Sequence, residues 1–152
     1  MTSLSHLPVK IKRLVPIAQL PRYEHPGDSG ADLTAVIACT IEPQQWLAVP
    51  TGLSVEIPIG FELQIRPRSG LAFKKGITVL NAPGTIDAGY RGEIKVILIN
   101  HGFSPFEIQA GDKIAQMVVA TVVFGEFTEV TELDESIRGG GGFGSTGTVY
   151  AG

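Results

Sequence analysis

A segment rich in proline and glycine, residues 81–92, carries the first set of side chains that could do chemistry. Its sequence, NAPGTIDAGYRG, predicts a hairpin in which backbone N–H and C=O groups stay accessible. The hairpin would present the amide of Asn81, the carboxylate of Asp87 and the ring of Tyr90. A carboxylate within hydrogen-bond reach of a water molecule can act as a general base. Each of the three side chains, taken alone, could instead belong to an ordinary turn.

A second segment, residues 66–72 with the sequence RPRSGLA, has groups that bind phosphate. Arg68 supplies a guanidinium, Ser69 supplies a hydroxyl, and Gly70 leaves the backbone bare at the start of a predicted helical turn. The N–H groups at a helix start and a guanidinium both favour phosphate oxygens. A solvated basic turn is the alternative interpretation.

Two further segments place polar side chains beside apolar runs. Asp32 lies in residues 29–33, SGADL, directly before such a run, where a turn or capping role is the alternative. Gln116 ends residues 111–116, GDKIAQ, in which the Gly-Asp pair predicts a turn. Both side chains could therefore act on a ligand or serve only the local backbone.

The fifth segment lies near the C-terminus, where residues 138–152 contain seven glycines and one charged side chain, that of Arg138. Phe143, Ser145 and Thr146 add an aromatic ring and two hydroxyls. Ordering this backbone would cost at most about 20 kcal/mol, because fixing one residue costs ~1–2 kcal/mol. Few apolar side chains are available to offset that cost. We therefore predict a flexible arm that becomes ordered only when a ligand binds, following a β domain of residues 1–137.

Together the five segments supply phosphate donors, a carboxylate base, an amide for the edge of a nucleobase, and aromatic rings. This set of groups fits a nucleoside polyphosphate. A nucleotide phosphohydrolase is one interpretation that the residues alone leave open. The P-loop pattern G-x-x-x-x-G-K-[ST] is absent from the sequence.

Short β-branched runs separated by glycine and proline must position these segments. Residues 61–65 alternate strictly between apolar and polar side chains, as a half-buried strand does. Residues 94–99 and 117–124 are apolar on both faces and predict central, covered strands. Further strands are predicted at residues 9–15 and, as one or two strands, at residues 46–57. The pattern predicts an all-β sandwich or barrel with at most one short helix.

Composition excludes several classes of protein. The net charge of −3 gives no overall basic excess for binding nucleic acid. The single cysteine, Cys39, excludes an intrachain disulfide. No run approaches the ~18 apolar residues that a membrane helix needs, and the first residues lack the pattern of a signal peptide. We predict a soluble, cytoplasmic protein without a nucleic-acid or membrane partner.

The five segments, in this order and spacing, resemble the five motifs of the trimeric dUTPase family. The resemblance covers residues 9–147 and is most specific in residues 84–92, GTIDAGYRG, and residues 142–147, GFGSTG. It implies a jelly-roll-like β-sandwich or barrel, a homotrimer, and a C-terminal arm that completes a neighbouring subunit's active site. It also implies a dUTP diphosphatase, in which water attacks the α-phosphate of dUTP and releases dUMP and pyrophosphate. Such an enzyme limits uracil incorporation into DNA and supplies dUMP for thymidylate synthesis.

The resemblance implies three catalytic roles. Asp87 would be the general base for the attacking water. Gln116 would contact the α-phosphate region or that water. Mg²⁺ would be bound by the triphosphate oxygens, and Asp32 would touch a metal-bound water without ligating the metal itself.

The remaining implied roles concern substrate binding. Tyr90 would pack against the deoxyribose and exclude a 2′-hydroxyl, Asn81 and nearby backbone groups would bind uracil, and Phe143 would stack on it. Residues 68–70 would hold the phosphates, and residues of the arm would hold the γ-phosphate. The full set of implied substrate-binding residues is Arg68, Ser69, Gly70, Asn81, Thr85, Ile86, Asp87, Tyr90, Lys95, Arg138, Phe143, Gly144, Ser145 and Thr146.

Two alternatives stay open beside this interpretation. One is a dCTP deaminase of the same fold, and the other is a non-catalytic trimer that binds nucleotides. Asp87 and Tyr90 in the hairpin favour phosphate hydrolysis over deamination.

Overall fold

The computed structural model of the chain describes residues 6–147, and these residues form eleven short strands and one helix. The elements are β1 (Lys10–Arg13), β2 (Ala31–Thr34), β3 (Cys39–Ile41), β4 (Trp46–Pro50), β5 (Leu53–Glu56), β6 (Phe61–Arg66), α1 (Ser69–Lys75), β7 (Ile77–Val79), β8 (Gly84–Ile86), β9 (Lys95–Asn100), β10 (Phe106–Ile108) and β11 (Lys113–Thr121). The predicted all-β fold with one short helix is confirmed.

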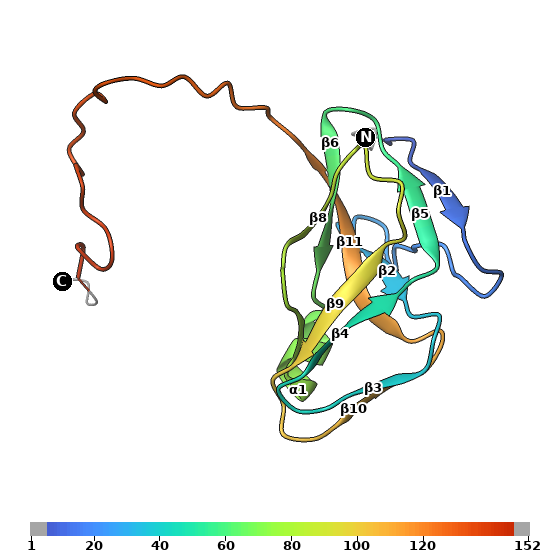
Figure 1. Cartoon of the computed structure of the whole chain (residues 1–152). Coiled ribbons are helices and arrows are strands. Elements are labelled where there is room, and N and C mark those ends of the chain that lie inside the picture. The colour runs from blue at the N-terminus through green and yellow to red at the C-terminus, as the bar shows by residue number, and fades with distance from the viewer. Residues whose placement is uncertain (1–5, 148–152) are drawn as a thin grey trace.

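Two antiparallel sheets form the layers of a sandwich (Figure 1), in which β4 and β9 lie in front of β11, β6 and β8. The larger sheet has the strand order β2-β11-β6-β8, and the smaller has the order β4-β9-β7. The pairs β1–β5 and β3–β10 extend the structure beyond these layers. The largest fully buried side chains belong to one core: Leu33, Ile41, Val49, Leu53, Leu63, Ile77, Ile94, Val96, Leu98, Ile108 and Ile114.

The alternation predicted for residues 61–65 decides which side chains of β6 enter the core. Leu63 and Ile65 are buried there, whereas Gln64 and Arg66 lie on the outer face of the larger sheet. Because successive side chains of a strand point to opposite faces, this strand can cover the core and present polar groups outside it.

The predicted strand region at residues 46–57 forms two strands that belong to different sheets. β4 pairs with β9, and β5 pairs with β1. The chain changes sheets at Gly52, whose φ of +67° lies in the left-handed region that favours glycine. The buried hydroxyl of Thr51 donates to the carbonyl of Ile94 at 2.6 Å and fixes this corner.

Two predicted strands have different bounds from those expected. β1 occupies only Lys10–Arg13. β11 is central as predicted but ends at Thr121, and the prediction that Val123 and Phe124 are covered is wrong within this single chain, because they are 93% and 72% exposed. The last backbone contact with the β body is the N–H of Val122, which donates to Gly60 at 2.9 Å.

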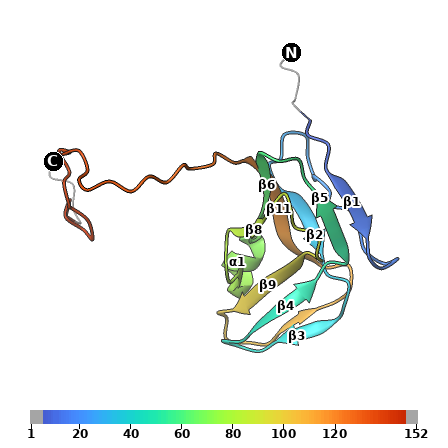
Figure 2. The ribbon, with the colours of Figure 1, turned by 45° about the horizontal axis from the view of Figure 1, so that its top comes forward.

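The chain after Val122 runs away from the sandwich as an extended segment (Figure 2). Every hydrogen bond that its described residues make joins two positions within residues 136–147. The predicted division into a domain of residues 1–137 and an arm of residues 138–152 stays a prediction. Residues 1–5 and 148–152 of those ranges lie outside the described residues.

None of the described helices is long and apolar enough to cross a membrane. The cytoplasmic location stays a prediction from the sequence.

Two buried polar side chains of the core predict opposite effects on stability. The amide of Asn100 donates to Ile41 and Ser104 at 2.8 and 2.9 Å and accepts from the N–H of Gly102 at 2.8 Å. By contrast, the hydroxyl of Thr34 is buried and finds no partner among the described residues. A buried polar group without a partner costs ~1–3 kcal/mol.

We expect Asn100→Ala to lower the free energy of unfolding by about 3 kcal/mol, and Thr34→Val to raise it by about 1 kcal/mol. Urea unfolding at one protein concentration measures both, and equal effects of the two substitutions would contradict the assignment.

Candidate functional site

The first of two clefts lies on the outer face of the larger sheet and has a volume of about 680 Å³. The antiparallel register places Asp32 of β2, Gln116 of β11 and Arg66 of β6 in one cross-strand row. Directly opposed residues of neighbouring strands point to the same face. Asp32 and Gln116 therefore meet although 83 intervening residues separate them in the sequence.

A β-bulge in β11 brings a third side chain to this face. The pairing of β11 with β2 shifts between Lys113 and Ala115, and both Ile114 and Ala115 are buried. In a regular strand Lys113 would share the inner face with Ala115, because side chains alternate. The extra residue at the bulge reverses that order and turns Lys113 toward Asp32.

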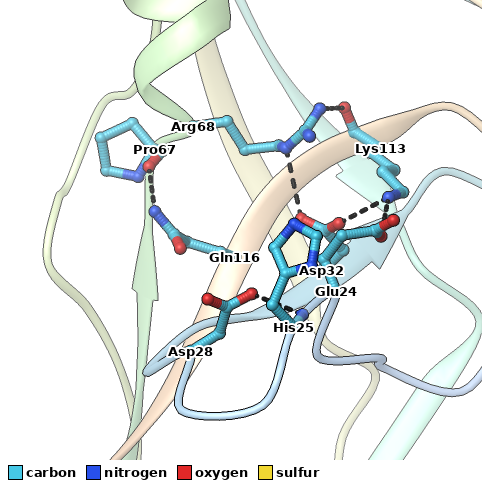
Figure 3. A network of polar contacts seen from close by, with 8 residues as sticks. All are labelled: Glu24, His25, Asp28, Asp32, Pro67, Arg68, Lys113 and Gln116. Atoms are coloured by element: carbon cyan, nitrogen blue, oxygen red, sulfur yellow. Dashed lines mark hydrogen bonds and ion pairs between the residues drawn. The ribbon is translucent and has the colours of Figure 1, made fainter.

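The charged groups of the first cleft form a connected network (Figure 3). Asp32 contacts Arg68 at 3.3 Å through one carboxylate oxygen and Lys113 at 2.8 Å through the other. Lys113 also pairs with Glu24 at 2.9 Å, and its backbone carbonyl accepts from Arg68 at 3.3 Å. The network therefore ties the start of α1 to the edge of the larger sheet.

The network also stabilises the charged forms of Lys113 and Glu24. Hydrogen bonds to Asp32 and then to Glu24 raise the pKa of Lys113 above its ordinary value. The hydrogen bond and positive charge of Lys113 lower the pKa of Glu24. Lys113 is therefore cationic and Glu24 anionic at neutral pH. Lys74 and Lys75 add positive charge to the same cleft, which suits it to an anion.

Gln116 is positioned by a hydrogen bond and by a glycine. Its amide N–H donates to the carbonyl of Pro67 at 3.0 Å (Figure 3). A Cβ atom on Gly30 would lie 2.9 Å from Gln116 Cδ and closer still to Oε1. The absence of a side chain at Gly30 therefore leaves the space that the Gln116 carboxamide occupies.

Ser69 and Gly70 begin α1 and line the first cleft. Arg68 precedes the helix in an extended conformation and makes no side-chain cap. The first backbone N–H groups of a helix have no intrahelical partner. Ser69 and Gly70 thus present N–H groups beside the Arg68 guanidinium.

The second cleft has a volume of about 430 Å³ and lies between residues 81–90 and β9. The predicted hairpin over residues 81–92 is wrong, because its strand β8 pairs with β6 of the larger sheet, whereas β9 belongs to the smaller sheet. Asn81, Asp87 and Tyr90 of this segment nevertheless line the cleft together. Thr85, Ile86 and Lys95 line it as well. Asp87 is exposed, and Tyr90 is 43% exposed, so both can meet a ligand.

The arm carries the remaining predicted residues away from both clefts. Arg138 donates to Gly141 at 2.8 Å within the arm, and the ring of Phe143 is fully exposed. Gly144, Ser145 and Thr146 form a local turn with it. The fold of one chain thus divides the predicted residues into three groups. The first cleft holds Asp32, Arg68, Ser69, Gly70 and Gln116. The second cleft holds Asn81, Thr85, Ile86, Asp87, Tyr90 and Lys95, and the arm holds the others.

Besides Lys74 and Lys75, four more charged residues that the sequence did not single out as site residues lie in the two clefts. Glu24, Asp28 and Lys113 line the first, and Glu93 lines the second. Lys113 lies within the polar segment of residues 111–116, but no pattern in the sequence marks the bulge that turns its side chain outward. Glu93 directly follows residues 81–92, and this position was the one feature of the sequence that could have indicated it.

The described residues contain no group of three or more His, Cys, Asp or Glu side chains arranged to hold a metal ion. Mg²⁺ usually keeps several waters and binds through one or two carboxylates together with substrate phosphates. In the first cleft both oxygens of the Asp32 carboxylate already contact cations, Arg68 and Lys113, so a metal ion there would need the negative charge of a bound ligand.

Comparisons with known proteins identify the family to which this chain belongs. A family model described as dUTPase matches residues 17–147. The deoxyuridine 5'-triphosphate nucleotidohydrolase of Picosynechococcus sp. is 56% identical over 140 residues, which are 92% of this chain and 99% of that protein. The protein of the same name from Wolinella succinogenes is 54% identical over 147 residues, which are 97% of this chain and 99% of that protein.

The fold is also that of solved structures. The dUTPase of Staphylococcus bacteriophage 80alpha with dUPNHPP is similar with a TM-score of 0.86 and 27% identity, over 93% of this chain and 99% of that one. This likeness confirms the predicted fold class. Because the family model spans most of the sequence and relatives more than half identical cover nearly all of it, the chain belongs to the dUTPase family.

Proposed function

We propose that this protein hydrolyses dUTP to dUMP and pyrophosphate, with Asp87 as the general base. The observation that carries the proposal is the second cleft, which gathers Asn81, Asp87 and Tyr90 around one opening. The family membership and the names of the relatives support the same reaction.

In this proposal the second cleft binds the nucleoside. Asn81 and backbone groups near Thr85 and Ile86 bind the edge of uracil, and Lys95 contributes from β9. Cytosine would be rejected because its amino donor would face a donor and leave buried groups unpaired. The ring of Tyr90 packs against the deoxyribose and leaves no room for a 2′-hydroxyl.

The first cleft then binds the phosphates. Arg68 and the N–H groups of Ser69 and Gly70 contact the phosphate oxygens, and they stabilise the charge that develops on the leaving pyrophosphate. Gln116 orients the attacking water or the α-phosphate. Lys113 keeps Asp32 and the Arg68 guanidinium in place through the ion pairs described above.

The chemical step is an in-line displacement at the α-phosphorus. Asp87 accepts a proton from the attacking water, the new P–O bond forms, and the bond to the bridging oxygen of pyrophosphate breaks. Bound Mg²⁺ supplies positive charge to the triphosphate oxygens. Asp32, whose carboxylate contacts Arg68 and Lys113, would accept from a water bound to that ion.

The two clefts share no lining residue among those described, so one isolated chain offers no single opening with both sets of groups. This separation supports a homotrimer in which the first cleft of one subunit faces the second cleft of a neighbour. The chain leaves the sandwich after Val122, and the arm at its end would close such a site from a third chain. Phe143 would stack on uracil, and Arg138, Ser145 and Thr146 would hold the γ-phosphate.

We expect Asp87→Asn to lower kcat by about 10²–10⁴-fold, because the amide cannot accept the proton of the water. The dissociation constant for dUTP should stay nearly unchanged. Pyrophosphate release and equilibrium binding measure the two quantities. Glu56→Gln, at an exposed residue outside both clefts, is the matched control and should retain full activity. In labelled water, the new oxygen should appear in dUMP, and its appearance in pyrophosphate would disprove attack at the α-phosphorus.

Mixing two inactive variants tests whether subunits share a site. Asp87→Asn leaves the first cleft intact, and Arg68→Gln leaves the second intact. If neighbouring chains build each site, about a quarter of the sites in randomly mixed trimers would pair two intact clefts. Refolding the two variants together should therefore restore part of the activity, whereas each variant refolded alone should stay inactive. No recovery in the mixture would place both clefts of one site in the same chain.

Removal of residues 138–152 should leave the trimer intact and lower kcat/KM for dUTP by about 10²-fold or more. Stacking of an aromatic side chain on a base contributes ~1–3 kcal/mol, and the γ-phosphate contacts would be lost in addition. Light scattering after size-exclusion chromatography gives the oligomeric state, and pyrophosphate release gives the rate. A truncated protein that is monomeric would show that the arm holds the subunits together.

A further inference from the structure

We infer that Gly92 is a positioning residue for the ring of Tyr90, and that through this ring it sets the preference for dUTP over UTP. The part of the inference that concerns substrate preference rests on the proposed function. The placement of the ring against Gly92 is a property of the structure by itself.

The ring of Tyr90 lies where a side chain at residue 92 would be. A Cβ atom on Gly92 would lie 2.6 Å from Tyr90 Cζ and 3.0 Å from Cε2, and closer still to the hydroxyl oxygen. Carbon atoms that are not bonded prefer separations of about 3.5–4.0 Å. Gly92 does not have the positive φ that would itself call for glycine. The neighbouring ring is therefore what requires a residue without a side chain.

Hydrogen bonds on both sides of Gly92 restrain its backbone against moving away from an added methyl group. The carbonyl of Arg91 accepts from the buried Ser54 hydroxyl at 2.6 Å, and the side-chain carboxylate of Glu93 accepts from the N–H of Gly52 at 2.9 Å. The N–H of Ile94 donates to Leu53 at 2.8 Å. Residues on both sides of Gly92 are thus attached to the corner between β4 and β5.

The ring of Tyr90 is held more weakly than this backbone. It is 43% exposed, and its hydroxyl makes one hydrogen bond, to the carbonyl of Glu93 at 2.9 Å. A methyl group at residue 92 would therefore displace the ring and break that hydrogen bond. The ring forms a wall of the second cleft, so its displacement opens the space that should refuse a 2′-hydroxyl.

Gly89 provides a matched control in the same loop. A Cβ atom on Gly89 would meet nothing within 4 Å, and its φ is not in the left-handed region. Gly89→Ala adds the same methyl group to the same turn without touching the Tyr90 ring. It should leave the preference for dUTP over UTP at the wild-type value.

The experiment compares kcat/KM for dUTP and for UTP in the wild type, Gly92→Ala, Tyr90→Ala, the double variant and Gly89→Ala. We expect Gly92→Ala to lower the dUTP/UTP ratio about tenfold, because residues in contact are energetically coupled. In the Tyr90→Ala background the further change at Gly92 should alter the ratio less than about twofold, because the coupling partner is gone. An unchanged ratio in Gly92→Ala, or a full effect without the ring, would overturn the inference.

A crystal structure of Gly92→Ala separates this inference from the proposed function. The Tyr90 hydroxyl should no longer lie within hydrogen-bond distance of the Glu93 carbonyl, and this readout needs no activity. A ring in its original place would reject the positioning role. A wild-type protein that does not hydrolyse dUTP would reject the proposed function, while the displaced ring would still support the role of Gly92.

Discussion

The pairing register of β2, β11 and β6 is the constraint on which the first cleft depends. It opposes Asp32 to Gln116 and Gln116 to Arg66, and the bulge at Ile114 adds Lys113 to the same face. A slip of one residue would turn every one of these side chains into the core, because the faces of a strand alternate. The buried residues between them, such as Leu33 and Leu63, oppose such a slip. The packing of the hydrophobic core thus determines which face of the larger sheet carries the polar side chains of the first cleft.

The second cleft depends on a different kind of constraint. The loop of residues 87–93 has few buried side chains, and the hydrogen bonds that Arg91 and Glu93 accept attach it to the corner around Gly52 and Ser54. The ring of Tyr90 occupies the space where a Cβ atom of residue 92 would be, and the carboxamide of Gln116 occupies the same kind of space at Gly30. In both clefts a candidate site residue therefore occupies the space left by a glycine that has no Cβ, and a hydrogen bond orients its side chain.

Local patterns were enough to predict the all-β fold and the alternation of β6, since each depends on residues close together in the sequence. The hairpin predicted around Asp87 was wrong, because β8 pairs with the more distant strand β6 and not with β9. The bulge in β11 was not predictable, because Ile114 and Ala115 fit either register until β2 is paired with them. The change of sheet at Gly52 and the network joining Lys113 to Glu24 depend on contacts between distant segments for the same reason. The end of β11 was predicted too late because Val123 and Phe124 are apolar yet uncovered in one chain.

The separation of the two clefts on one chain has a consequence for how activity would begin in a cell. If neighbouring chains complete each site as proposed, a newly synthesised chain is inert until it assembles. The rate per chain would then fall on dilution, as the equilibrium moves toward free subunits. Expression level would set a threshold below which the substrate persists, although every molecule of the protein is correctly folded.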